Sequence, residues 1–229
     1  MCTSIIHNGK KTIVGWNLDI LDMEYQVKST EDMVSINIKD ETEGWLPLFG
    51  ANSRGDFVAM PTCWPFDERS NPNSTQEKNI INLDIDLLLK KKTLAEIKHI
   101  VETEKISSVP GVTFQASLSD KEGNVLQIIP GQGYQYKEKP TYSLMTNFSP
   151  FKGDKELHPW MGLDRYETAK NMLDEANEDF GVEEAFAILE GTAQEICPTV
   201  VSMVFDVDAN KVYWCENREW KNRKEQQMY

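Results

Sequence analysis

The chain has 229 residues but few cysteines and histidines, and these shortages argue against several kinds of site. The cysteines show no CxxC spacing, which would indicate a zinc or redox motif; they are Cys2, Cys63, Cys197 and Cys215. The three histidines are scattered, so no His/Cys/Glu spacing indicates a metal centre. We therefore expect no metal and no other cofactor, and we expect the thiols to stay reduced in a cytoplasmic protein.

The chain also contains few basic residues and lacks long apolar runs. The 24 Lys and Arg residues are outnumbered by 37 Asp and Glu residues, which gives a net charge of −13. This charge disfavours anionic membrane surfaces, and it disfavours a nucleic-acid partner, which needs a basic patch. No run reaches the ~18 apolar residues of a membrane-spanning helix, and Lys10 and Lys11 precede any signal-peptide core. The sequence predicts a cytoplasmic protein without a nucleic-acid or membrane partner, and it leaves a homo-oligomer open.

The second residue is the most informative one that is present. If Met1 is removed, Cys2 carries both a thiol nucleophile and a free α-amine. The amine, with a reference pKa of ~7.7–8.0, suits a general base near neutral pH, and the thiol has a reference pKa of ~8.5. N-terminal nucleophile hydrolases use this arrangement. The alternative is an ordinary buried cysteine, and Cys2 taken alone favours that alternative.

Two short predicted strands, 3–6 and 12–16, flank the dipeptide Asn8-Gly9. Asn-Gly is a strong hairpin signal because both turn positions need positive φ. A hairpin here runs the second strand back beside the first. It therefore brings Asp19 close to Cys2.

Further strands and paired helices follow along the chain. Alternating apolar residues predict strands at 33–38, 45–51, 56–60, 111–118, 124–129, 142–146, 200–206 and 211–215. Apolar stripes predict helices at 85–91, 164–178 and 182–192, and a capping box of Thr93 and Glu96 begins another. Residues 64–80 are rich in Pro, Asn and Ser and predict a long loop. Because βαβ alternation is absent, we predict one α+β domain over residues 1–229, with two stacked antiparallel sheets flanked by helix pairs.

Two N-terminal motifs resemble a known group of enzymes. The chain opens with Met1-Cys2-Thr3-Ser4 and continues with Gly15-Trp16-Asn17-Leu18-Asp19. These motifs resemble the opening of the choloylglycine hydrolase, penicillin V acylase and acid-ceramidase-like family of N-terminal-cysteine (Ntn) hydrolases. Later segments similar to family motifs follow in family order, at 50–55, 118–124, 145–148 and 164–167. The resemblance implies an αββα sandwich and cleavage of linear, non-peptide C–N amide bonds.

The resemblance also implies a catalytic set whose chemistry is consistent with the residue types. Cys2 would supply the thiol and the amine, and Asp19 would orient the ammonium and tune its pKa. Asn147 would donate its side-chain NH₂ to the developing oxyanion. Arg165 would lie near the nucleophile and pair with Asp19 or another carboxylate, because the dipole disfavours a cation at a helix start. Taken singly, Asp19 is equally consistent with a strand-end carboxylate, Asn147 with a turn residue and Arg165 with a solvated helix residue.

Five further residues are assigned to substrate binding: Trp16, Asn17, Thr62, Cys63 and Trp64. Trp16 stands where the family has an arginine, so the resemblance implies either an apolar substrate there or weakened activity. The family's second oxyanion position falls near Thr62 and Cys63, where a backbone N–H would serve. Trp64 would line an apolar acyl pocket or, alternatively, cap the core.

The sequence thus predicts a cysteine amidohydrolase whose small-molecule substrate joins an apolar acyl group to a small polar amine. Cys2 would attack the carbonyl, an acyl-enzyme would form, and water would release it. Two alternatives stay open. One is an acyltransferase, in which an amine or thiol replaces water; the other is a catalytically decayed small-molecule binding protein, which Trp16 favours. A purely structural acidic protein is a third alternative, and it predicts no pocket near Cys2.

Overall fold

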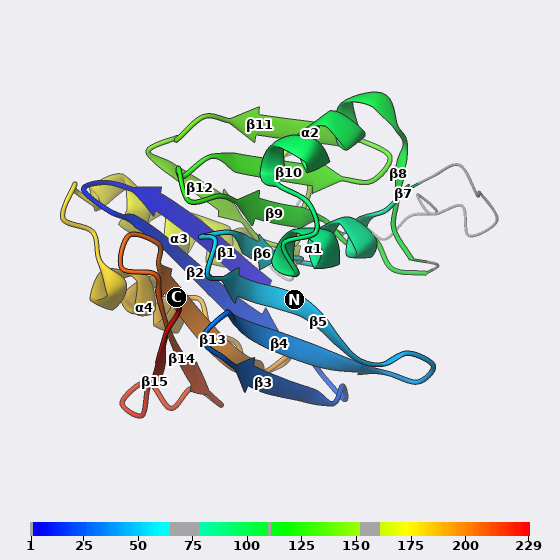
Figure 1. Cartoon of the computed structure of the whole chain (residues 1–229). Helices are drawn as coiled ribbons and strands as arrows, with labels where there is room; N and C mark the ends of the chain where they lie inside the picture. The colour runs from blue at the N-terminus through cyan, green and yellow to red at the C-terminus, as the bar shows by residue number, and fades with distance from the viewer. Residues whose placement is uncertain (1, 65–77, 110, 152–160) are drawn as a thin grey trace.

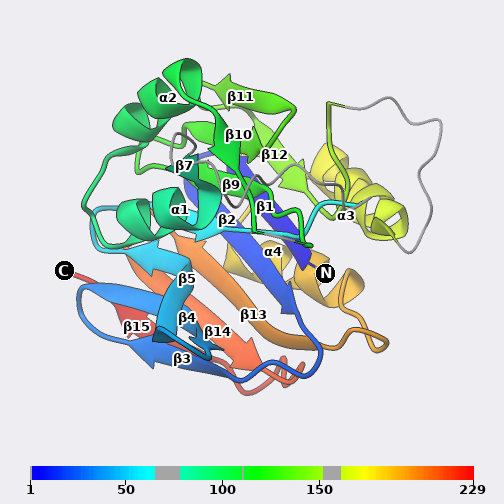
Figure 2. The ribbon, with the colours of Figure 1, turned by 90° about the vertical axis from the view of Figure 1, so that its right-hand side faces the viewer.

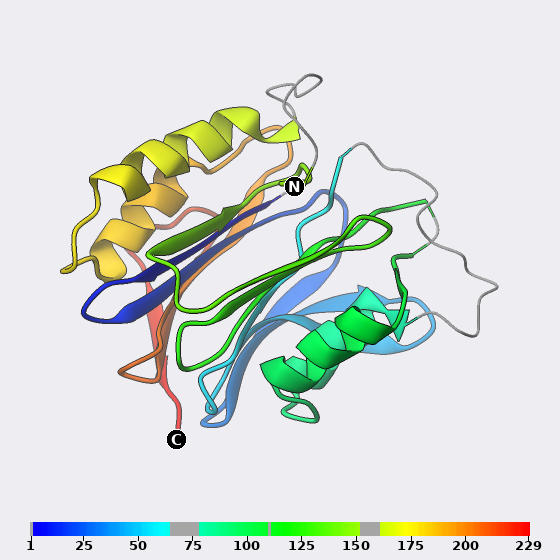
Figure 3. The same ribbon diagram turned by 90° about the horizontal axis from the view of Figure 1, so that it is seen from above.

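The computed structural model describes residues 2–64, 78–109, 111–151 and 161–229. Two antiparallel sheets lie face to face, and each carries a pair of helices on its outer side (Figures 1 and 3). The helices α3 (Leu163–Glu175) and α4 (Val182–Gly191) cover the first sheet, and α1 (Ile80–Leu88) and α2 (Leu94–Thr103) cover the second. This arrangement confirms the predicted α+β sandwich of αββα type.

The first sheet is built around the N-terminal hairpin. Its strand order is β12-β1-β2-β13-β14-β15. The strands are β1 (Cys2–Asn8), β2 (Thr12–Asp19), β12 (Tyr142–Met145), β13 (Thr199–Asp206), β14 (Lys211–Glu216) and β15 (Lys224–Gln227). In the predicted hairpin, Cys2 of β1 lies opposite Leu18 of β2, so Asp19 ends β2 beside the start of β1. Figure 2 shows both strand ends at the same edge of the sandwich.

The turn of this hairpin differs from the predicted one. Residues 9–11 connect the strands, and neither Asn8 nor Gly9 has positive φ. Asn8 instead donates its side-chain amide to the carbonyls of Gly123 and Pro140, at 3.0 and 2.7 Å. Gly9 is required for a close approach, because a Cβ there would lie 2.5 Å from the Glu178 carbonyl oxygen. The Asn-Gly pair therefore serves tertiary contacts rather than a primed two-residue turn.

The second sheet contains seven strands in the order β11-β10-β9-β6-β5-β4-β3. They are β3 (Tyr25–Ser29), β4 (Met33–Asp40), β5 (Gly44–Asn52), β6 (Phe57–Ala59), β9 (Ala116–Ser119), β10 (Val125–Ile129) and β11 (Gly133–Lys137). A parallel pair, β7 (Lys78–Asn79) and β8 (Ile106–Ser107), lies apart from both sheets. The predicted strand 111–118 is wrong at its start. The strands β3 and β11 were not predicted, because these sheet-edge strands are largely exposed and polar and lack a continuous apolar face.

The helices follow the sequence pattern, with one error. The capping box at Thr93 and Glu96 is present at the start of α2, as predicted. The predicted helix 85–91 is wrong, because α1 begins at Ile80 and ends at Leu88. Its start is set by Asn79, whose side chain accepts a hydrogen bond from the Ile81 N–H at 2.9 Å. Within the described residues, no helix is long and apolar enough to cross a membrane.

The long loop predicted at 64–80 can be compared with the structure only at its ends. Residues 65–77 lie outside the described residues, while 78–79 form β7 and Ile80 begins α1. The loop therefore ends earlier than predicted.

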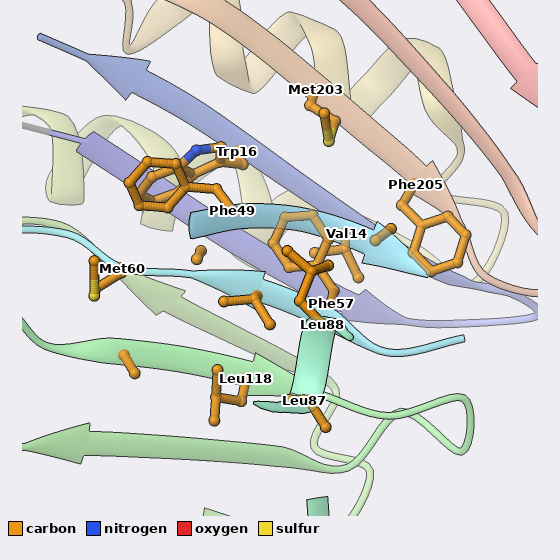
Figure 4. Close-up of a cluster of buried hydrophobic side chains, with 14 of the residues drawn as sticks. Val14, Trp16, Phe49, Phe57, Met60, Leu87, Leu88, Leu118, Met203 and Phe205 are labelled. Carbon is orange, nitrogen blue, oxygen red and sulfur yellow. The ribbon is translucent and has the colours of Figure 1, made fainter. Parts of the chain in front are cut away.

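The main core fills the space between the two sheets. Alternate residues of β2 face it, so Val14 and Trp16 pack against the second sheet (Figure 4), and Leu18 belongs to the same core. The opposite face of β2 contributes Ile13 to a second core beneath α3 and α4. This alternation also decides which polar residues of β2 reach the inter-sheet space and which face the helices.

Candidate active site

Cys2 lies at the first position of β1 and is almost completely buried. Its backbone nitrogen donates a hydrogen bond to the Asn147 Oδ1 atom at 2.8 Å. Burial raises the pKa of the Cys2 thiol to about 11, and the positive charges of the chain's amino group and of Arg165 oppose this rise. The thiol is therefore protonated near neutral pH and needs a base to become a nucleophile.

Asn147 connects Cys2 to Thr62, which lies beyond the end of β6 and forms an isolated bridge with Phe114. Its Oδ1 atom accepts hydrogen bonds from the Cys2 nitrogen and from Arg165 Nη2, both at 2.8 Å. Its Nδ2 atom donates to the Thr62 carbonyl oxygen at 2.8 Å and to Thr62 Oγ1 at 3.0 Å. Because donors surround one end of the amide and acceptors the other, the network fixes its orientation.

Arg165 is the third residue of α3, and its guanidinium points inward. Its Nη1 atom donates to the Cys2 carbonyl oxygen at 2.6 Å and approaches Thr3 Oγ1 at 3.3 Å. Gly162, which precedes α3 at a φ of +93°, makes room for this group, since a Cβ there would lie 2.6 Å from Arg165 Nη2. These contacts explain why a cation stands near the start of a helix, where the dipole disfavours it.

Asp19 is fully buried beside Cys2. Its Oδ2 atom lies 3.8 Å from Arg165 Nη1 and accepts a hydrogen bond from Gln194 Nε2. Its Oδ1 atom accepts a hydrogen bond from Thr199 Oγ1 at 2.6 Å. Burial raises the pKa of Asp19 to about 6, and the Thr199 hydrogen bond and the Arg165 charge oppose this rise.

A cavity of about 320 Å³ opens beside Cys2, between the two sheets. Its polar end contains Cys2, Asp19 and Thr62. The remaining lining is mainly apolar and consists of Leu18, Ile20, Leu21, Met23, Ile38, Leu48, Phe49, Met60, Val112, Phe114 and Cys197. The site thus combines a buried thiol, a carboxylate and an apolar chamber. Among the described residues, no three His, Cys, Asp or Glu side chains gather as a metal site would require.

No protein-family model matches the chain. No curated protein matches it either. Solved structures do. The C2A mutant of conjugated bile acid hydrolase from Clostridium perfringens has a TM-score of 0.70 at 13% identity, over 100% of this chain and 92% of that chain. The chain has the Ntn hydrolase fold.

Two further structures agree with this fold. Penicillin V acylase from Agrobacterium tumefaciens has a TM-score of 0.63 at 14% identity, over 94% of this chain and 83% of that chain. The Caenorhabditis elegans ortholog of N-acylethanolamine-hydrolyzing acid amidase has a TM-score of 0.63 at 16% identity, over 90% of this chain and 93% of that chain. The resemblance first noted in the N-terminal motifs therefore extends to the whole fold.

The Ntn hydrolase fold brings the predicted catalytic residues together but separates several predicted binding residues from the cavity. The side chains of Asp19, Asn147 and Arg165 and the backbone of Cys2 lie in one connected network. Thr62 joins them and lines the cavity.

Two predicted binding residues of β2 do not line the cavity. Trp16 lies in the inter-sheet core, where its ring packs on Phe49 with 5.6 Å between centroids (Figure 4). Asn17 faces the helices instead and donates to the Leu189 carbonyl oxygen at 2.7 Å. Both side chains are fully buried.

The other two predicted binding residues follow Thr62 directly. The Cys63 nitrogen donates to the Thr113 carbonyl oxygen at 2.7 Å, and the Trp64 nitrogen donates to the Asn147 carbonyl oxygen at 2.6 Å. Both therefore support the cavity wall through their backbones without lining the cavity.

Sequence reasoning missed three residues that shape this network. Gln194 and Thr199 hold Asp19, and Gly162 makes room for Arg165. A signal for Thr199 existed in principle, because it stands directly opposite Asp19 once β13 pairs with β2. No local pattern indicates that pairing in advance.

Proposed function

We propose that this chain is an Ntn cysteine hydrolase that cleaves a linear, non-peptide amide bond through an acyl-Cys2 intermediate. One observation carries the proposal. The Cys2 thiol lines an apolar cavity while the nitrogen of the same residue is hydrogen-bonded to Asn147, with Asp19 and Arg165 beside it. A nucleophile, a base on the same residue and groups that orient the base are the parts such a reaction needs.

The chemistry begins with removal of Met1, which converts the Cys2 nitrogen into an α-amine with a reference pKa of ~7.7–8.0. This amine takes the thiol proton as sulfur attacks the substrate carbonyl carbon. The resulting ammonium then gives the proton to the leaving nitrogen, the C–N bond breaks, and a thioester remains on Cys2. Water, deprotonated by the same amine, attacks the thioester and releases the carboxylic acid.

The neighbouring side chains have distinct tasks in this scheme. Asn147 Oδ1 and Asp19 hold and orient the amine, and Arg165 anchors both the Cys2 carbonyl and the Asn147 amide. Asn147 Nδ2 is the candidate oxyanion donor. Its hydrogens point to the carbonyl oxygen and Oγ1 of Thr62, so the oxyanion binds Nδ2 in place of Thr62 Oγ1. One such donor is typically worth ~10²–10³ in rate.

The cavity favours an apolar, uncharged acyl group. Its volume of about 320 Å³ is roughly twice that of an engineered protein cavity that binds benzene, about 150 Å³. Among the described lining residues none carries a positive charge, so an acyl group with its own carboxylate finds no partner there. Trp16, where the resembling family has arginine, places further aromatic surface behind Phe49.

The first experiment uses protein expressed without an N-terminal tag. Intact mass shows whether Met1 is removed, and a panel of N-acyl amides of graded acyl length tests turnover. Acid-quenched samples should show an acyl adduct on wild type and none on Cys2→Ala. Cys197→Ala is the matched control, because Cys197 is the other cysteine that lines the cavity. The acyl adduct on Cys2 should persist in this variant.

Two outcomes separate the alternatives. A product formed with an added amine in place of water indicates an acyltransferase. Retained Met1, no adduct, and ligand binding that survives Cys2→Ala indicate a binding protein and overturn the proposed hydrolysis.

A further inference from the structure

We propose that Thr199 and Gln194 are positioning residues that hold Asp19 as an anion beside Cys2 and thereby set the acidic limit of the reaction. The hydrogen bonds to Asp19 stand by themselves, while the link to turnover rests on the proposed function. Gln194 lies in the connection between α4 and β13, and Thr199 is the first residue of β13.

The directions of the hydrogen bonds favour an ionised Asp19. Thr199 Oγ1 accepts a hydrogen bond from the Gln194 backbone N–H at 2.9 Å, so its single hydrogen is free to point at Asp19 Oδ1. Gln194 Nε2, an amide nitrogen, can only donate, and it donates to Asp19 Oδ2. Each carboxyl oxygen therefore faces a donor, which is the arrangement that an anion needs and a protonated carboxyl does not.

The segment that carries these donors is braced against the sheet. The Thr199 nitrogen donates to the Gln194 carbonyl oxygen at 3.1 Å, which closes the segment on itself. The Ile20 nitrogen donates to the Pro198 carbonyl oxygen at 3.3 Å, which ties it to the end of β2. Thr199 also stands opposite Asp19 in the ladder between β2 and β13. The donors are thus fixed by backbone contacts rather than by mobile side chains alone.

Burial and charge decide the consequence of losing a donor. Asp19 is fully buried. Cys2 from β1 and Arg165 from α3 lie beside it, Cys197 lines the same cavity, and the positive charge of the chain's amino terminus acts on it. Burial already raises the pKa of Asp19 to about 6, and the Thr199 hydrogen bond holds it from rising further. Without that bond the carboxylate takes up a proton at a higher pH, and the amine of Cys2 loses the anion that orients it.

The test compares Thr199→Val, which removes the hydroxyl at nearly constant shape, with Thr199→Ser, which keeps it. In Thr199→Val, the acidic limb of the plot of kcat/KM against pH should shift to higher pH by about one to two pH units. This is the shift expected for the loss of one hydrogen bond to a buried charge. Thr199→Ser should restore the wild-type limb, and Gln194→Leu should shift it in the same direction. Thr192→Val is the matched control, a buried threonine directly after α4 whose hydroxyl donates to the Ile188 carbonyl and accepts from Asn17.

A second readout does not depend on turnover. The carboxyl carbon of Asp19, identified by its absence in Asp19→Asn, is titrated by NMR in wild type and in Thr199→Val. An upward shift of its midpoint, together with the shifted pH limb, supports the proposal. An unchanged midpoint overturns it, and so does a shifted midpoint with an unchanged limb. If wild type turns over no amide, the proposed function fails, while the titration alone still decides whether these residues hold the anion.

Discussion

Replacing Gly162 by alanine should disable the site through Arg165, without touching any residue that meets the substrate. Gly162 has a φ of +93°, and the added Cβ would lie 2.6 Å from Arg165 Nη2. An alanine in this left-handed region costs about 1–2 kcal/mol for the backbone alone. Gly44 supplies the matched control, because its φ is +77° and a Cβ there meets nothing within 4 Å.

The contact adds a second cost that Gly44→Ala lacks. To restore an ordinary separation of 3.4 Å from 2.6 Å, the guanidinium must move by about 0.8 Å (3.4 − 2.6). A shift of that size along the 2.8 Å bond to Asn147 Oδ1 stretches it to about 3.6 Å, which is no longer a hydrogen bond. Losing a hydrogen bond to a charged group costs about 1.5–3 kcal/mol. Gly162→Ala should therefore be less stable than Gly44→Ala by about that amount.

Urea unfolding measures the stability difference, and amide turnover measures the effect on the site. Displacement of Arg165 also releases the Cys2 carbonyl and the Asn147 amide, so turnover should fall by about 10²-fold in Gly162→Ala. Gly44→Ala should keep wild-type turnover. Equal stability and equal turnover in the two variants would refute the reasoning, because Arg165 would then not need its observed position.

Two further predictions concern the core and the cavity. Both Asp84 oxygens are buried without a hydrogen-bond partner among the described residues, and burial raises the pKa of this carboxyl well above its usual range. The protonated carboxyl's contribution to stability is fully present below an unfolded pKa of ~3.9 and is lost as pH rises from there through the raised folded pKa. The free energy of unfolding of Asp84→Asn, measured in urea, should therefore increase relative to wild type as pH rises above ~3.9, and a difference that stays constant with pH contradicts this. Leu48→Trp should narrow the cavity and lower kcat/KM for long acyl chains relative to short ones by ~10–100-fold. An unchanged ratio would place the acyl group elsewhere.

Local sequence patterns determined most of the secondary structure and one part of the site. The alternation in β1 and β2 placed Cys2 at a strand start and Asp19 beside it, because an antiparallel hairpin brings the two ends together. The capping box of Thr93 and Glu96 fixed the start of α2 for a similarly local reason. The αββα arrangement was predictable as well, since hairpins and paired helices leave few ways to bury their apolar faces.

Tertiary structure alone decided the rest of the site. Asn147 and Arg165 meet Cys2 across 145 and 163 residues of sequence, and no local rule specifies such contacts. Thr199 reaches Asp19 only because β13 pairs with β2, and Gly162 matters only because the guanidinium of Arg165 occupies the space of its missing side chain. Trp16 shows the same limit, since it shares the inter-sheet face of β2 with Leu18, which lines the cavity, yet its ring packs on Phe49 in the core. The sequence determined which residues share a strand or helix, and the packing of the two sheets decided which of them share a site.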